Sequence, residues 1–296
     1  MKLQLIACSL AALIGAAQVQ ATESAAPKAP ASTVTSAAFS KVLAGDWRSP
    51  ENSARDVFRH PQQTLQFFGL RPNQTLIEIT PGSGWYSELL APLLNKQGHY
   101  IAAVQNADSG DNSRKSLEKL KQKFSADPTH YAKAKIVEFD PQAPVFGKPA
   151  SADSVLTFRN VHNWVMADDA PAMFKGFYAV LKTGGTLGIV DHRAKDDATE
   201  ESIKDSGYLP TAYVVKLATD AGFTLVGASE VNANPKDTKD YPAGVWTLPP
   251  TYTLGDQDRD KYKAIGESDR MTLRFIKLKP KGKQHHPVKA ISAVKP

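Results

Sequence analysis

The chain has 296 residues, of which 42% are hydrophobic and 22% charged, a composition typical of a globular protein and unlike that of a fibrous or disordered chain. Its formal net charge is +6, but residues 277–296 contain six lysines and no acidic residue, which leaves 29 basic against 30 acidic residues in 22–276. The charge therefore gives no support to a nucleic-acid-binding surface in the folded part of the chain.

The N-terminal residues 1–21 have the pattern of a signal peptide. Lys2 precedes an alanine-rich apolar stretch, and Val19-Gln20-Ala21 fits a cleavage site, so we expect cleavage after Ala21 and a periplasmic or secreted protein. The single cysteine, Cys8, lies in this segment. Cleavage would therefore leave no disulfide, thiol nucleophile or cysteine metal site.

Two segments beside the predicted domain contain few of the large apolar residues that form a core. Residues 22–40 are rich in Ala, Ser, Thr, Pro and Lys, which predicts a flexible linker. Residues 278–296 are predicted to form a basic disordered tail, for which we expect weak contact with anionic envelope surfaces. A single domain over 41–277 lies between them.

Within this domain, short β-branched runs alternate with amphipathic stretches. Asn52-Ser53 predicts a capped helix that stops before Pro61, and a second helix, Gln62 to Phe68, is expected to end at Gly69. Strands are expected at 75–79, 100–104, 136–139, 154–158, 186–190, 223–226 and 272–277, and further helices at 85–94, 117–124, 173–181 and 214–221. This alternation predicts an α/β fold with a mostly parallel sheet, helices on both faces and ligands beyond the carboxyl ends of the strands.

A glycine turn follows the first predicted strand. Glu78 ends the strand and Pro81-Gly82-Ser83-Gly84 leads into a helix, so the backbone can approach a ligand closely. A nicotinamide-dinucleotide site would need a further glycine near residue 87, where the chain has Ser87. The pattern instead resembles the first motif of class I S-adenosylmethionine-dependent methyltransferases.

Later segments extend this resemblance over Gln74 to Lys277, in the order that the family has them. Asp140 ends the third strand, residues 158–164 follow the fourth, and residues 180–187 look like the family's "LKPGG" turn, with Thr183 in the proline place. Further phrases near residues 55–61, 232–238, 244–249 and 266–271 resemble an exported branch of methyltransferase-like proteins. The resemblance implies a Rossmann-like class I fold, a seven-stranded sheet with an antiparallel last strand, and S-adenosylmethionine as cofactor.

The family's motifs imply which residues would contact the cofactor. These are Glu78, Pro81, Gly82, Ser83, Gly84, Gln105, Asp140 and Asn160. For Glu78 an alternative interpretation is a structural carboxylate that accepts backbone hydrogen bonds from the turn. The second strand departs from the family pattern. An acidic residue that hydrogen-bonds the ribose hydroxyls is expected directly after it, but Gln105 and Asn106 occupy these positions and the first acidic residue is Asp108.

Histidines and an aspartate after the fourth and fifth strands are the candidates for catalysis. His162 has a side chain suited to a general base, although a lone histidine is equally compatible with a structural role. Asp191 and His192 are neighbours on an extended chain and point to opposite sides, so we expect Asp191 to pair with His162 instead. An Asp191–Arg193 ion pair is the structural alternative. We assign catalysis to His162, Asp191 and His192.

Substrate contacts are expected at Trp164 and Arg193, with the insertion at 232–268 as an outer wall. We interpret this insertion as a lid, the alternative being a surface flap packed by its own aromatics. Arg55 and Arg59 lie four residues apart on one helix face, which favours internal ion pairs over an anion site. No set of three metal ligands is visible in the sequence.

The sequence thus predicts an exported methyltransferase that acts on a small molecule. The alternative is a binding module that keeps the fold and holds a nucleotide-like or aromatic ligand without turnover. Export and the absent ribose acid favour this alternative, because S-adenosylmethionine is made in the cytoplasm. A nicotinamide oxidoreductase fits less well, since the third glycine and the acid are both missing.

Overall fold

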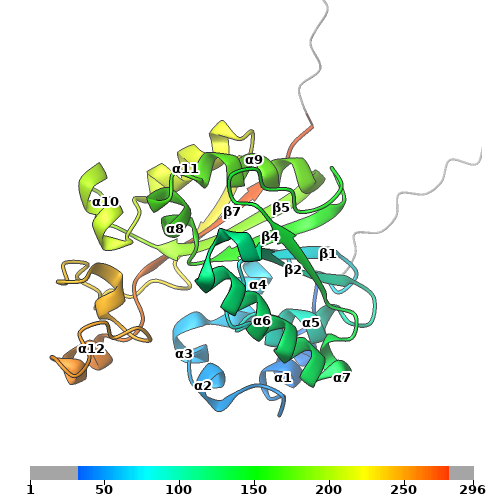
Figure 1. Cartoon of the computed structure of the whole chain (residues 1–296), viewed down its shortest axis with the longest axis horizontal. Helices are drawn as coiled ribbons and strands as arrows, with labels where there is room; N and C mark the ends of the chain where they lie inside the picture. Colours follow the sequence, from blue (N-terminus) through cyan, green and yellow to red (C-terminus); the bar gives the residue numbers. More distant parts are fainter. Residues whose placement is uncertain (1–32, 280–296) are drawn as a thin grey trace, which may run out of the picture. The chain divides into compact units, whose positions relative to one another are not determined.

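The computed structural model describes residues 33–279, which contain a seven-stranded sheet of order β3-β2-β1-β4-β5-β7-β6 (Figure 1). The strands are β1 (Thr75–Ile79), β2 (His99–Gln105), β3 (Lys135–Phe139), β4 (Ala152–Phe158), β5 (Leu181–His192), β6 (Thr224–Ser229) and β7 (Arg270–Ile276). Strands β1 to β5 are parallel, and β7 is antiparallel to both β5 and β6, between which it lies. The predicted mostly parallel sheet is confirmed. The predicted signal peptide and most of the predicted tail lie outside the described residues.

Helices cover both faces of the sheet, as Figure 1 shows for α8, α9 and α11 on one side and α4 to α7 on the other. The helices are α1 (Ser36–Leu43), α2 (Pro50–Ser53), α3 (Asp56–Arg59), α4 (Pro61–Phe67), α5 (Ser87–Leu94), α6 (Asp111–Ala126), α7 (Pro128–Tyr131), α8 (Val161–Met166), α9 (Ala170–Val180), α10 (Glu200–Ser206), α11 (Thr211–Asp220) and α12 (Arg259–Ile265), with 3-10 turns η1 (Ala107–Ser109) and η2 (Gly244–Thr247). Among residues 33–279, no helix has the length and apolar character needed to cross a bilayer.

The alternation of side chains along each strand divides the core into two clusters. Ile77 and Ile79 of β1 pack with α9 and α11, whereas Leu76 packs with α1, α4 and α5. Since neighbouring residues of a strand point to opposite faces, a strand buried on both faces must be nearly all apolar. The run Thr75–Ile79 meets this requirement except at Glu78, which is 2% exposed.

Strand β1 lies in the middle of the sheet. The chain adds β2 and β3 on one side of it and then returns to add β4 and β5 on the other side. A ligand crevice is expected beyond the carboxyl ends of β1 and β4, where the strand order reverses. The residues that follow these two strands both have left-handed backbones: Thr80 has φ 51° and Arg159 has φ 61°. Such conformations are costly for residues other than glycine and gather at functional sites.

The predicted linker 22–40 is wrong in its last part. Helix α1 begins at Ser36, capped by Thr35, and Phe39 is 2% exposed within the core. Val34 also donates a backbone hydrogen bond to the carbonyl of Leu70. Residues from 34 onward therefore belong to the folded domain, because two apolar side chains in a polar stretch suffice to anchor one short amphipathic helix.

One local prediction about helices is also wrong, and one short helix was not predicted. The helix expected from Asn52 to Pro61 is split into α2, capped by Ser49, and α3. The segment after β4, for which no helix was predicted, forms helix α8 directly after Asn160. The short length of these helices explains both differences, since four to six residues show no apolar period.

The insertion at 232–268 contains η2 and α12 and is fixed to the domain by buried hydrogen bonds. Asn232 donates from Nδ2 to the hydroxyls of Thr64 and Thr272 at 3.0 and 2.9 Å. The carboxylate of Asp237 accepts from the Asp269 amide at 2.7 Å and from the Tyr208 hydroxyl at 3.0 Å. The insertion is thus an anchored part of the domain, and its opening as a lid stays a prediction.

Candidate active site

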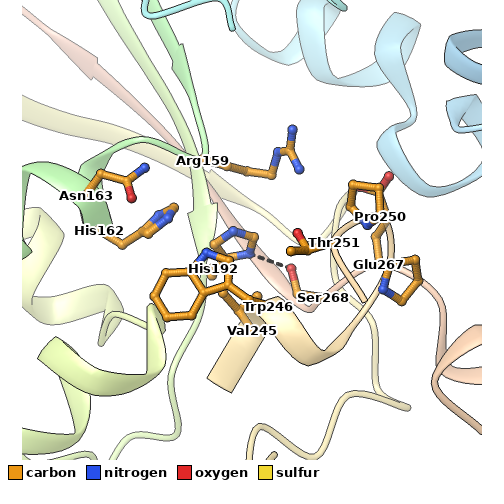
Figure 2. Close-up of a pocket in the computed structure, with 11 residues that line it drawn as sticks. Arg159, His162, Asn163, His192, Val245, Trp246, Pro250, Thr251, Glu267 and Ser268 are labelled. Atoms are coloured by element: carbon orange, nitrogen blue, oxygen red, sulfur yellow. Dashed lines mark hydrogen bonds between the residues drawn. The ribbon is translucent and has the colours of Figure 1, made fainter. Parts of the chain in front are cut away.

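A cavity of about 190 Å³ lies at the carboxyl ends of β4 and β5 (Figure 2). The strand side supplies residues that follow β4, residues of α8 and the end of β5, and the insertion supplies the opposite wall. The lining residues are Arg159, His162, Asn163, His192, Val245, Trp246, Pro249, Pro250, Thr251, Glu267 and Ser268. Its position matches the strand edge at which the sequence predicts ligand binding.

His162, which lines this cavity on the strand side, is paired with the buried Asp191. Asp191 is fully buried, and its Oδ1 lies 2.8 Å from Nδ1 of His162. Oδ1 and Oδ2 also accept backbone N–H groups, at 2.7 Å from His192 and at 2.6 Å from Val161. A carboxylate at Asp191 accepts this hydrogen bond, which selects the tautomer of His162 with the proton on Nδ1; in the neutral ring Nε2 then carries the lone pair. The predicted pairing of Asp191 with His162 is confirmed.

His192 lies beside this pair and is held by the insertion. Its Nδ1 lies 2.5 Å from Oγ of Ser268, and its ring centroid is 4.9 Å from that of His162. Burial, followed by the proximity of His162 and Arg159, lowers the pKa of His192 well below its usual range. His192 is therefore neutral near pH 7 and can offer a hydrogen-bond donor or acceptor, but no charge.

His162, Asp191 and His192 also place three nitrogen or oxygen ligand atoms within 4.8 Å of one another. However, the two oxygens of Asp191 already accept four hydrogen bonds, three of them from backbone N–H groups. A carboxylate has about four lone-pair positions, so this carboxylate has no free position for a cation. The donor set fits a hydrogen-bonded acid–base pair better than a metal centre.

Two predicted substrate residues lie away from the cavity, and these placements correct the prediction. Trp164 is 2% exposed and packs against Phe177 in the core. On a helix, residues two apart face different sides, so α8 can present His162 to the cavity only by turning Trp164 inward. Arg193 pairs with Asp269 and Glu230, both at 2.8 Å, and does not line the cavity.

The predicted position of the insertion as the outer wall of the cavity is confirmed. Arg159, Trp246, Glu267 and Ser268 line the cavity but were not named as site residues. The sequence offers one usable signal, the position of Arg159 directly after a predicted buried strand. The other three come from the insertion, more than 80 residues along the chain from His162. The preference for internal ion pairs is confirmed, because Nε of Arg55 and of Arg59 both contact Glu267, at 2.7 and 3.2 Å.

The glycine turn combines a ligand-facing position with a packing position. A Cβ at Gly82, an exposed residue with φ 60°, would meet no atom within 4 Å. A Cβ at Gly84 would lie 3.3 Å from Leu120 and Lys123 of α6. Gly82, with its exposed neighbour Ser83 and half-buried Pro81, fits a cofactor contact, whereas Gly84 permits close packing of α6.

The remaining predicted cofactor residues divide in the same way. Glu78 accepts hydrogen bonds from Tyr100 at 2.6 Å and Ser87 at 3.4 Å, and no backbone N–H of the turn donates to it. Asn160 donates to the carbonyl oxygens of Ile79 and Thr80, so it ties the end of β4 to the end of β1. Both side chains are thus engaged inside the fold.

Gln105 and Asp140 lie at the ends of β2 and β3 with free hydrogen-bonding capacity. Oε1 of Gln105 accepts from Ser113 at 3.0 Å, which leaves its amide N–H groups available. Asp140 is exposed and accepts the backbone N–H of Gln142. The hydroxyl of Thr80, directly after β1, is buried without a hydrogen-bond partner among the described residues. These groups provide polar positions along the predicted cofactor edge.

We expect the two glycines of the turn to respond differently to substitution. Gly82→Ala should lower the free energy of unfolding by about 1–2 kcal/mol, the cost of a left-handed alanine. Gly84→Ala should cost at least about 1 kcal/mol more, because its Cβ also crowds α6. Urea denaturation of both variants measures this difference, and equal losses would contradict the packing role of Gly84.

No protein-family model matches the sequence, and no curated protein matches it. Solved structures do resemble this domain. An S-adenosylmethionine-dependent methyltransferase from Aquifex aeolicus aligns with a TM-score of 0.52 at 14% identity, over 78% of this chain and 94% of that chain. The [4+2]-cyclase SpnF aligns with a TM-score of 0.54 at 12% identity, over 80% of this chain and 86% of that chain. At these identities the likeness concerns the fold, and the chain has the fold of class I S-adenosylmethionine-dependent methyltransferases.

Proposed function

We propose that the protein is an exported S-adenosylmethionine-dependent methyltransferase that acts on a small molecule, with His162 as general base. The observation that carries this proposal is the Asp191–His162 pair, buried at the strand edge that also holds the glycine turn. Export rests on the predicted signal peptide. The fold supports methyl transfer without deciding it, since the cyclase with a similar structure shows that one fold can host different reactions.

The residues at the cofactor edge fit S-adenosylmethionine in part. Gly82 leaves open space above the turn, and the unpartnered hydroxyl of Thr80 is a polar atom that a ligand could satisfy. Gln105 would hold the ribose hydroxyls with amide N–H groups, and Asp140 would accept the adenine amino group. When bound, the cofactor supplies a methyl group on a positively charged sulfur.

The chain's own contribution to the reaction is positioning and proton removal. Asp191 fixes the tautomer and the orientation of His162, so Nε2 can accept a proton from a substrate hydroxyl or amine. Neutral His192 and Ser268 provide hydrogen-bonding groups beside it. Trp246, whose ring centroid lies 6.1 Å from that of His162, covers the pair on the side of the insertion.

A non-catalytic binding module is the second candidate, and Gln105 is the observation that favours it. An amide holds ribose hydroxyls less strongly than a carboxylate does, because hydrogen bonds to an ionised group are roughly twice as strong. Weak cofactor affinity would suit a protein that has kept the fold but lost the reaction.

Isothermal titration calorimetry with S-adenosylmethionine and S-adenosylhomocysteine tests the proposal on the purified protein. We expect both to bind, and Gly82→Val to abolish binding because a branched side chain would fill the open space above the turn. Absence of binding by either compound to the folded protein would overturn the methyltransferase assignment and leave the binding module.

Gln105→Glu should increase affinity for S-adenosylmethionine by about 10-fold, the effect of replacing neutral by charge-assisted hydrogen bonds. Glutamate has nearly the same shape as glutamine and can still accept from Ser113. Gln97 lies on the loop before the amino end of β2, whereas Gln105 lies at its carboxyl end. Gln97→Glu therefore adds the same charge away from the site and should leave affinity unchanged. Equal affinities for wild type and Gln105→Glu would show that Gln105 does not face the ribose.

A further inference from the structure

Positive charge is in excess around the cavity. Four arginines surround a single carboxylate, Glu267, which lies in the cavity wall. Three of them contact it, through Arg55 Nε at 2.7 Å, Arg270 Nη1 at 3.1 Å and Arg59 Nε at 3.2 Å. The fourth, Arg159, lines the cavity and makes no side-chain hydrogen bond or ion pair with any residue in 33–279.

Donor groups in this cluster outnumber the available acceptors. Nη2 of Arg55 and Nη2 of Arg59 are buried and have no hydrogen-bond partner within the described part of the chain. Arg59 is only 2% exposed and rests over the Trp85 ring, with its guanidinium carbon 4.6 Å from the centroid. Since Glu267 neutralises one of the four charges, the cluster retains about three positive charges in a largely buried place.

The pKa directions agree with this excess. Burial raises the pKa of Glu267, but the arginines, led by Arg59 and Arg270, outweigh burial and lower it to about 2. Burial, with Arg270 and Arg55, lowers the pKa of Arg159 to about 10 against the opposing effect of Glu267. Arg159 is half-buried, so its charge has lost part of its hydration without gaining a carboxylate partner, and this is costly. Its retention beside an acid–base pair indicates a ligand that supplies the missing negative charge.

The backbone conformation of Arg159 directs its side chain into the cavity. Its left-handed conformation, φ 61°, is fixed by a 2.7 Å hydrogen bond from its N–H to the carbonyl of Val190. Figure 2 shows the guanidinium extending across the cavity from the strand side toward the insertion. A planar guanidinium with all its N–H groups free matches the paired oxygens of a carboxylate or phosphate.

Charge and volume restrict the ligand further. Burial and the neighbouring His162 lower the pKa of His192 most, and Arg159, Arg270 and Arg59 lower it further. The positive charge of these arginines therefore disfavours a cation at the histidines and favours an anion. The volume of about 190 Å³ slightly exceeds that of a cavity of about 150 Å³ that holds benzene. An acceptor of roughly this size, with one anionic group, fits the space between Trp246 and the strand ends.

We infer that the cavity binds the carboxylate or phosphate group of a small methyl acceptor through Arg159, with the acceptor's nucleophile directed to Nε2 of His162. The identification of this ligand as a methyl acceptor rests on the proposed function. The anion site itself does not, because it depends only on the arginine cluster and the cavity.

Binding of inorganic phosphate and of acetate tests the site without any cofactor. Thermal unfolding and calorimetry are measured at constant ionic strength, with chloride as the reference anion. At least one of the two anions should raise the melting temperature of the wild type, and the stronger one identifies the preferred group. Arg159→Gln should weaken its binding by about 10- to 100-fold, the effect of losing charge-assisted hydrogen bonds. Arg114→Gln removes a largely exposed arginine on α6 and should bind like the wild type.

Without anion, Arg159→Gln should melt at the same temperature as the wild type or higher. The substitution removes a positive charge that is repelled by Arg270 and Arg55 and attracted by Glu267, whose charge the other arginines already neutralise. A merely structural arginine would give a lower melting temperature and unchanged anion binding, and that result would overturn the inference. So would the absence of any effect of both anions on the wild type. Anion binding without S-adenosylmethionine binding would instead leave the anion site and remove the proposed methyl transfer.

Discussion

His162→Ala is expected to lower the kcat of methyl transfer by about 10²- to 10⁴-fold, the usual contribution of a positioned general base. Cofactor affinity should stay unchanged, because His162 faces the cavity between α8 and the insertion and the glycine turn lies on another loop. The rate is measured as S-adenosylhomocysteine release with small hydroxylated carboxylates and phosphate esters as acceptors. Cofactor affinity is measured by calorimetry on the same samples.

A matched control is His99→Ala. This variant removes an exposed histidine at the amino end of β2, whereas the cavity lies at the carboxyl ends of the strands. This variant should keep the wild-type rate. If His162→Ala also kept it, with an acceptor that the wild type methylates, the assignment of His162 as general base would be wrong.

Asp191→Asn extends this test to the partner of the base. All four hydrogen-bond partners of Asp191 are N–H groups, and an asparagine would direct its own N–H₂ group at some of them. We therefore expect a loss of about 1–3 kcal/mol in the free energy of unfolding, together with a fall in kcat similar to that of His162→Ala. An unchanged rate would show that Asp191 does not orient the base.

The second large effect concerns Glu78 and the pH dependence of stability. Burial raises the pKa of Glu78 from 4.5 to about 7, although hydrogen bonds from Tyr100 and Ser87 oppose the shift. Between these two pH values the folded protein therefore holds a proton that the unfolded chain has released. Stability must fall as pH rises through this window, by about 3 kcal/mol for this group.

Glu78→Gln should remove this part of the pH dependence. Glutamine keeps an oxygen for the Tyr100 hydroxyl and cannot ionise, so the variant should gain about 3 kcal/mol relative to the wild type between pH 4.5 and 7. Urea denaturation of both proteins at several pH values measures the difference, and contributions of all other groups cancel in the comparison. Glu118→Gln, an exposed change on α6, should follow the wild type. Parallel curves for Glu78→Gln and wild type would show that the pKa of Glu78 is not raised.

Glu78 illustrates how much of a site local sequence patterns can predict. Glu78 could be placed at the end of a buried strand from the sequence, and the strand Thr75–Ile79 has the predicted bounds. Its hydrogen-bond partners could not be predicted, because Tyr100 and Ser87 reach it from β2 and α5 only once these elements pack. The interpretation of Glu78 as an acceptor for the turn's backbone was wrong for this reason.

The pairing of His162 with Asp191 was predictable because it depends only on strand order and on side-chain alternation. Parallel neighbours β4 and β5 bring their carboxyl ends together, and alternation separates Asp191 from His192. Trp164 was misplaced because the six residues of α8 show no period in the sequence, and helix phase decides which of its side chains meets the cavity.

The sequence by itself determined the α/β class, the parallel sheet, the strand edge at which the cavity lies and the position of the glycine turn. These features depend on apolar periodicity and turn residues, which are properties of neighbouring positions along the chain. Only the tertiary structure decided the composition of the cavity, since Arg159, Trp246 and Glu267 come from segments far apart in sequence. It also decided the charge of the cavity, because an arginine in a sequence gives no sign of whether a carboxylate lies within reach. That depends on the packing of the insertion against α3 and the strand ends, which pairs three arginines with Glu267 and leaves Arg159 without a partner among residues 33–279.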